Sequence, residues 1–189
     1  MSDSDDDNPT VTRSLSEGVV AAHAAAPAEG LTVVDHAHYE LLGERARGGL
    51  GRILEARDRR TGRVVAVKQV LRPDPDTLRR FASEALLTAN LQHPSIVPVY
   101  EVGRWSEGDP FFAMMLVKGR SLDDLIDEAK GAPERLALLP HLIDVAEALA
   151  YAHGERVIHR DLKPANVLVG AYGETVVIDW GLARVRPLV

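Results

Sequence analysis

The stretch that most constrains this chain is His159–Asn166, which runs His-Arg-Asp-Leu-Lys-Pro-Ala-Asn between two short apolar runs. Asp161 can accept a proton, and Lys163 can neutralise a phosphate. Asn166 offers a hard oxygen atom of the kind that magnesium prefers as a ligand, and Asp179 offers a second one shortly afterwards. The sequence therefore gathers acid, cation and oxygen ligands into one short region.

The segment that follows predicts how these groups meet. The apolar runs Val167–Val169 and Val176–Ile178 flank a turn that contains glycine, and such a pair of runs predicts an antiparallel hairpin. The hairpin would carry Asn166 and Asp179 to the same end. A base, a cation and two metal ligands that converge on one point are the equipment for phosphoryl transfer.

These two motifs resemble the catalytic loop and the metal-binding motif of eukaryotic-type protein kinases, a family that bacteria also carry. Trp180 stands where the family usually has phenylalanine. The resemblance implies that Asp161 is the catalytic base, that Lys163 steadies the transferred phosphate, and that Asn166 and Asp179 hold Mg2+. A lysine at position 163 is the signature of serine/threonine-type members, and in the family the histidine at position 159 is architectural.

A glycine-containing stretch, residues 46–53, lies between two predicted strands. Glycines let a backbone approach a ligand closely and point its N–H groups at phosphate oxygens. The stretch resembles the nucleotide-covering loop of protein kinases, with alanine in the first glycine position and isoleucine in place of valine. The resemblance implies nucleotide contacts from Ala46, Gly48, Gly49, Gly51 and Ile53.

Lys68 lies inside an apolar run, at the spacing from Ala46 at which the family places the lysine that holds the α- and β-phosphates. A strand lysine judged without that spacing would be an edge residue facing solvent. Residues 76–91 predict a helix by their apolar periodicity. Glu84 on this helix matches the family's ion-pair partner for Lys68, and formation of that pair is the usual on-switch.

Further strands are predicted over residues 96–105 and 111–117. They would complete a small lobe of five antiparallel strands and one helix. In protein kinases the last strand leads into a hinge whose backbone reads adenine. The resemblance therefore implies an adenine pocket that includes Ala66, Met114, Met115 and Val117.

The expected architecture is an α+β, protein-kinase-like fold in three parts. Residues 1–35, acidic and rich in alanine, are expected to be disordered; residues 36–117 would be the small lobe, and residues 118–189 the first part of a helical large lobe. The later kinase segments are not in the sequence, so we expect an incomplete catalytic domain. Leu136–His153 predicts a helix that is apolar on most faces, which a partner or a second copy of the chain would cover.

Composition excludes several classes of function. A net charge of −6 argues against a nucleic-acid surface. The chain has no cysteine, which excludes disulfides and thiolate metal sites and suits a reducing compartment. It also lacks a basic signal-peptide start and an apolar run of bilayer length. We expect a cytoplasmic protein that binds no membrane through these residues.

Three functions remain open at this point. The first is a serine/threonine protein kinase that uses ATP and Mg2+ to phosphorylate protein hydroxyl groups. The second is a non-catalytic ATP-binding or regulatory module. The third is a small-molecule phosphotransferase on the same fold, which the complete His159–Asn166 string disfavours.

Overall fold

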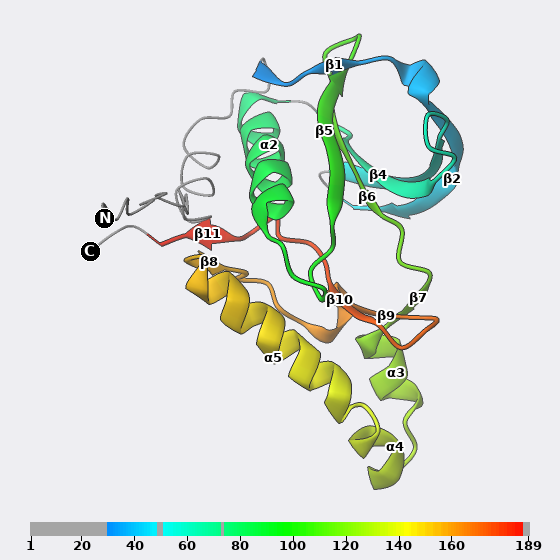
Figure 1. Cartoon of the computed structure of the whole chain (residues 1–189), viewed down its shortest axis with the longest axis vertical. Coiled ribbons are helices and arrows are strands. Elements are labelled where there is room, and N and C mark those ends of the chain that lie inside the picture. The colour runs from blue at the N-terminus through cyan, green and yellow to red at the C-terminus, as the bar shows by residue number, and fades with distance from the viewer. Residues whose placement is uncertain (1–29, 49–50, 73, 187–189) are drawn as a thin grey trace, which may run out of the picture.

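The structure, a computed structural model, describes residues 30–48, 51–72 and 74–186. Residues 1–29, which belong to the segment predicted to be disordered, and Gly49 of the glycine stretch lie outside the described residues. Figure 1 shows two lobes, one built on a twisted sheet with helix α2 beside it, the other on helices and short strands. Both lobes of the expected fold are therefore present.

The sheet of the first lobe has six strands within the described residues, in the order β1-β5-β6-β4-β3-β2. Along β3 the buried positions alternate with more exposed ones, as they do in a sheet with one covered face. The five predicted strands pair antiparallel, and they are β2 (Tyr39–Arg47), β3 (Gly51–Asp58), β4 (Val64–Val70), β5 (Val99–Trp105) and β6 (Pro110–Met115).

The sixth strand, β1 (Val33–Val34), corrects two predictions: the five-stranded sheet and the boundary of the disordered segment at residue 35. It pairs in parallel with Arg104 and Trp105 of β5. Val34 is buried there, because Gly103 has no side chain: a Cβ at Gly103 would lie 2.9 Å from Val34 Cγ2. A strand of two residues carries too little alternation to be recognised in the sequence.

Aromatic stacking holds the segment that follows this first strand to the sheet. The rings of Trp105 and Phe111 stack with their centroids 3.7 Å apart, and the Tyr39 ring meets both of them edge-on. His36, in the short helix η2 (His36–His38), stacks on Trp105 at 4.1 Å. Each such aromatic pair contributes about 0.5–1.5 kcal/mol beyond its burial.

Helix α2 (Pro75–Asn90) is displaced by one residue at each end from its predicted range. Asp74 caps it by accepting hydrogen bonds from the backbone N–H groups of Asp76 and Thr77. Pro75 fits the first helical turn, because the N–H group that proline lacks would have no partner within the helix at that position. Phe81 on its inner face packs against Phe112 of β6. The helix is thereby fixed to the sheet beside the strand that carries Lys68.

The second lobe begins with β7 (Gly119–Ser121) and α3 (Leu122–Glu128), whose start is capped by Ser121 together with Asp124. The helix predicted over Leu136–His153 is wrong at its start. It is divided into α4 (Ala132–Leu136) and α5 (Leu139–Gly154). Proline in the first turn of α5 has no N–H to continue an upstream helix, which explains the division.

The predicted hairpin is confirmed. After β8 (Val157–Ile158) and η3 (Pro164–Asn166), the chain forms β9 (Val167–Gly170) and β10 (Thr175–Val177), with Val167 opposite Val177. A last strand, β11 (Arg184–Val185), pairs with β8 and was not predicted.

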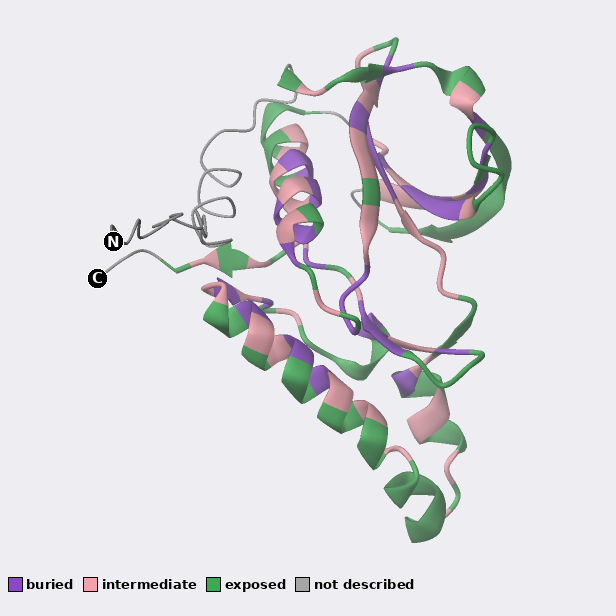
Figure 2. Cartoon of the chain, in the orientation of Figure 1, coloured by how far each residue is buried: buried purple, intermediate pink, exposed green. Residues whose placement is uncertain are grey.

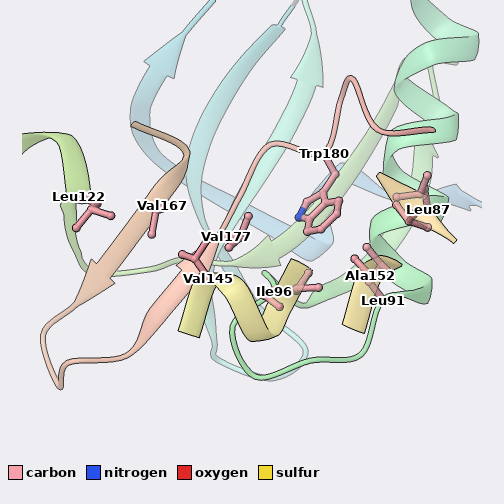
Figure 3. Packing of buried hydrophobic residues seen from close by; sticks show 11 residues of the cluster. Leu87, Leu91, Ile96, Leu122, Val145, Ala152, Val167, Val177 and Trp180 are labelled. Atoms are coloured by element: carbon pink, nitrogen blue, oxygen red, sulfur yellow. The ribbon is translucent and has the colours of Figure 1, made fainter. Parts of the chain in front are cut away.

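The core of the second lobe draws on both lobes. Figure 3 shows its side chains gathering between α2, α5 and the hairpin. Leu87 comes from α2, Leu91 directly follows that helix, Val145 comes from α5 and Val177 from β10, and Trp180 is buried among them. The apolar cluster therefore joins the helix of the first lobe to the hairpin that carries Asn166 and Asp179.

One face of α5 stays exposed, as expected from its apolar sequence. Figure 2 shows exposed positions alternating with buried ones along the helix. Leu142 and Ile143 are 49% and 59% exposed to solvent, whereas Val145 and Ala148 are buried in the core. In the part of the chain that the structure describes, no helix is both long and apolar enough to cross a membrane.

The close approach of β1 to β5 generates a prediction. Gly103→Ala should lower the free energy of unfolding by about 1–3 kcal/mol, because the added methyl group would overlap Val34 and crowd Phe111. Gly43→Ala is the matched control, since a Cβ there meets nothing within 4 Å. Urea denaturation of both variants provides the measurement, and equal stability of the two would contradict the packing described for β1.

Candidate active site

A cavity of about 490 Å³ holds most of the predicted site residues. Its wall comes from the glycine stretch, from the inner residues of the sheet and α2, and from the loop and hairpin of the second lobe. The predicted residues that line it are Ala46, Gly48, Gly51, Ile53, Lys68, Glu84, Met114, Asp161, Asn166 and Asp179.

Four predicted residues lie outside this wall, namely Ala66, Met115, Val117 and Lys163. Ala66 is buried opposite Met114 in the β4–β6 ladder, and Met115 lines a separate cavity of about 510 Å³. Lys163 contacts the site through Asp161 instead. Their roles toward a nucleotide, together with that of Gly49 outside the described residues, remain predictions.

The cavity is lined by more residues than the sequence indicated. Phe81, Thr88, Phe112 and Trp180 also line it, and none of them was predicted as a site residue. Phe81 was recognisable as part of an apolar helix face. Periodicity cannot distinguish a face that packs against a neighbour from one that borders a cavity.

Lys68 is the most constrained charge of the site. Its Nζ donates to Glu84 Oε1 at 2.5 Å and lies 3.4 Å from Asp179 Oδ1. Burial disfavours the charged ammonium, but the two carboxylates outweigh burial and keep the pKa of Lys68 above its ordinary value. The predicted Lys68–Glu84 pair is therefore formed in this structure.

Gly181 allows that arrangement. A Cβ at this position would lie 3.1 Å from Glu84 Oε2 and 3.3 Å from Asp179 Oδ1. A side chain here would press on both carboxylates that face Lys68. Asp179 itself has a φ of 60°, in the left-handed region that residues other than glycine seldom occupy.

Asp161 is held by its neighbours in the catalytic loop. Lys163 Nζ donates to its Oδ2 at 2.8 Å, and Asn166 Nδ2 donates to the same oxygen at 3.1 Å and to the backbone carbonyl of Asp161 at 2.8 Å. The hydrogen bond from Lys163 holds the pKa of Asp161 below its ordinary value. The carboxylate is therefore ionised and oriented at neutral pH.

His159 lies beneath this loop, in the supporting position that the resemblance implied. Its Nδ1 accepts the N–H of Asp161 at 3.3 Å, so Nε2 carries the proton and donates to the carbonyl of Ile178 at 3.1 Å. Burial lowers the pKa of His159 below its ordinary value, because the charged ring is poorly solvated there, and this outweighs the hydrogen bond to Ile178, which acts in the opposite direction. The ring also meets the Trp180 indole edge-on at 4.6 Å.

The oxygens of Asn166 and Asp179 fit a magnesium ion. Because Asn166 donates both hydrogen bonds through Nδ2, its Oδ1 is left to face a cation, and the Asp179 side chain is about half exposed at the cavity. The residues that the structure describes contain no cluster of three histidine or acidic side chains suited to a metal. Magnesium is ordinarily bound by one or two protein oxygens, and water and phosphate oxygens complete its coordination shell.

Comparison with known protein families supplies the deciding observation. The family described as the protein kinase domain matches residues 38–187. The chain belongs to the protein kinase family. The matched range covers every predicted site residue of this kinase domain and begins after β1.

Curated relatives agree with this placement. The kinase domain is similar to the serine/threonine-protein kinase PknD of Protochlamydia amoebophila, with 34% identity over 160 residues. It is 40% identical over 153 residues to a probable serine/threonine-protein kinase of Streptomyces coelicolor, and 38% identical over 149 residues to one of Clostridium perfringens. Each match covers 77% of this chain but only 16%, 22% and 22% of the respective relative.

The buried imidazole of His159 generates a pH prediction. The pKa of this ring is lower in the folded chain than in the unfolded chain. As pH falls below the ordinary histidine pKa of about 6.5, the ring therefore becomes protonated in the unfolded chain while it stays neutral in the folded chain. The free energy of unfolding should therefore decrease between pH 7 and pH 5. Urea denaturation of His159→Asn should show lower stability at pH 7 but a weaker dependence on pH.

His153→Gln is the matched control for that experiment, because His153 is an exposed histidine at the end of α5. It should keep the pH dependence of the wild type. A His159→Asn variant with the full wild-type pH dependence would show that this imidazole is not the group responsible.

Proposed function

We propose that this kinase domain belongs to a serine/threonine protein kinase, an enzyme that transfers the γ-phosphate of ATP to a serine or threonine hydroxyl group of a protein. The observation that carries the proposal is the meeting of Lys68, Asp161, Asn166 and Asp179 at one cavity, with the Lys68–Glu84 ion pair formed. These are the parts that phosphoryl transfer needs, since positioning and electrostatic stabilisation supply most of its catalysis.

The nucleotide would lie between the glycine stretch and Asp179. Ile53 and Met114 give the cavity apolar wall on which adenine can rest. Ala66, Met115 and Val117 would complete the adenine contacts from β4 and the hinge. Lys68 is already charged and held in place by Glu84, so it can bind the α- and β-phosphates without losing a partner.

The chemistry would be carried by the catalytic loop. Asp161 would accept a hydrogen bond from the substrate hydroxyl and take its proton, and Lys163 would steady the transferred phosphate from beside it. Magnesium, held by Asn166 and Asp179, supplies charge that neutralises the phosphates when it is bound. The lysine at position 163 and the serine/threonine kinases among the relatives support hydroxyl groups of serine and threonine as acceptors.

Two substitutions test the proposal. Lys68→Met should weaken Mg-ATP binding about tenfold or more, because a charge-assisted contact with the phosphates is lost.

Asp161→Asn should leave that affinity nearly unchanged and lower the rate of protein phosphorylation by about 100-fold or more, since its role lies in proton transfer. Isothermal titration calorimetry measures the affinity for Mg-ATP, and transfer of the γ-phosphate to a basic protein measures the rate of phosphorylation.

The outcomes separate the three functions considered at the outset. Unchanged ATP affinity in Lys68→Met would refute the nucleotide site. ATP binding without transfer would favour the non-catalytic module, and transfer to a small molecule in place of a protein would favour the third function.

We further propose that the exposed face of α5 promotes association of the chain at high concentration. Replacing Leu142 and Ile143 with glutamine should weaken association in analytical ultracentrifugation, because the exposed apolar area is removed. The free energy of unfolding should change by less than about 1 kcal/mol. Val145→Ala on the buried face is the matched control and should cost about 2 kcal/mol. Association that is unaffected by the double substitution would refute this proposal.

A further inference from the structure

Three polar side chains meet beneath the hairpin that carries the metal ligands. Thr175, the first residue of β10, is only 3% exposed. Its Oγ1 lies 2.5 Å from Asp144 Oδ2 and 2.8 Å from His141 Nδ1, both of which belong to α5. None of the three lines the cavity described above.

The direction of each hydrogen bond follows from the chemistry of the partners. The carboxylate of Asp144 can only accept, so the single hydroxyl proton of Thr175 goes to it. The lone pairs of Oγ1 then accept from His141, whose Nδ1 must carry a proton. The hydroxyl is thus saturated from two sides, and its burial excludes a role as a nucleophile.

The position of this cluster relates it to the site. Thr175 and Val177 point to the same side of β10, because side chains alternate along a strand. Val177 packs with Val145 and Ala148 of α5 in the core, while Thr175 is held by the turn of α5 before them. The strand therefore meets the helix at one polar and one apolar point.

The strand so held leads directly to the metal ligands. Ile178, which follows β10, donates its N–H to the carbonyl of Asn166 at 2.9 Å, and Asp179 is the next residue. Backbone hydrogen bonds tie Val177 of β10 to Ser95 and Val97, in the segment before β5. The apolar contacts of the hairpin with α5 are not directional, so they do not by themselves set one distance and angle to that helix. Two hydrogen bonds to one hydroxyl fix distance and angle together.

We propose that Thr175, His141 and Asp144 form a positioning cluster that sets the β9–β10 hairpin on α5 and so holds the oxygens of Asn166 and Asp179 in register for a divalent cation. The inference rests on the proposed function for the identity of the cation site. Small displacements of reacting groups are costly in catalysis, which gives such a cluster its use.

The first test measures the cluster without any ligand. In Thr175→Val, which keeps the shape and removes the hydroxyl, the Ile178 amide should exchange hydrogen at least tenfold faster than in the wild type. The Val67 amide of β4 should be unaffected, and Thr175→Ser should restore slow exchange. Should Thr175→Val fail to fold, His141→Phe removes one hydrogen bond at a partly exposed position and should also accelerate exchange at Ile178.

The second test measures the consequence for the cation. The Mg2+ concentration that gives half-maximal enhancement of ATP binding should rise at least fivefold in Thr175→Val and return toward the wild-type value in Thr175→Ser. Affinity for ATP without Mg2+ should stay the same. A merely structural role would lower the melting temperature and leave the Mg2+ dependence where it was.

The two readouts keep the inference separate from the proposed function. Unchanged exchange at Ile178 in both Thr175→Val and His141→Phe would overturn the cluster, whatever the protein binds. Faster exchange with an unchanged Mg2+ dependence would overturn its positioning role. A wild-type protein that binds no ATP at any Mg2+ concentration would overturn the proposed function, and with it the cation role stated here.

Discussion

The contact of Lys68 with Glu84 and Asp179 is the interaction on which the rest of the arrangement depends. It joins three segments that are far apart in the chain: β4, α2 and the end of the hairpin. A buried ion pair contributes little net stability, because desolvation offsets its attraction, but removing one partner leaves a buried charge unpaired. The pair therefore acts mainly as a constraint, and α2 and the hairpin must both be in place to satisfy Lys68.

Much of this arrangement could be predicted from the sequence, because its elements carry local signals. The hairpin follows from two apolar runs and a turn, and the cap of α3 from Ser121. The features that were missed depend on contacts between distant segments. β1 exists because Gly103 admits Val34, and the cluster at Thr175 exists because α5 presents two polar side chains to one buried hydroxyl. The contribution of α2 to the cavity wall likewise depends on how the helix packs, which periodicity does not show.

Trp180 shows how a departure from the family pattern is accommodated. The ring is almost fully buried, fills the core between α2 and the hairpin, and meets His159 edge-on. Its indole N–H has no hydrogen-bond partner among the residues described, a loss worth about 1–3 kcal/mol for a buried donor. The larger ring thus adds apolar burial at the position of the usual phenylalanine and leaves one polar group unsatisfied.

The two edges of the six-stranded sheet differ in how they resist pairing with another chain. β1 covers β5 with only two residues, which is too short a template for a further strand. β2 is nine residues long, but its register with β3 shifts twice. Its exposed positions include the charged side chains Glu44 and Arg45 as well as the apolar Leu41 and Leu42. Irregular, charged or very short edges are the means by which sheets avoid edge-to-edge aggregation. These features disfavour extension of the sheet at its two edges.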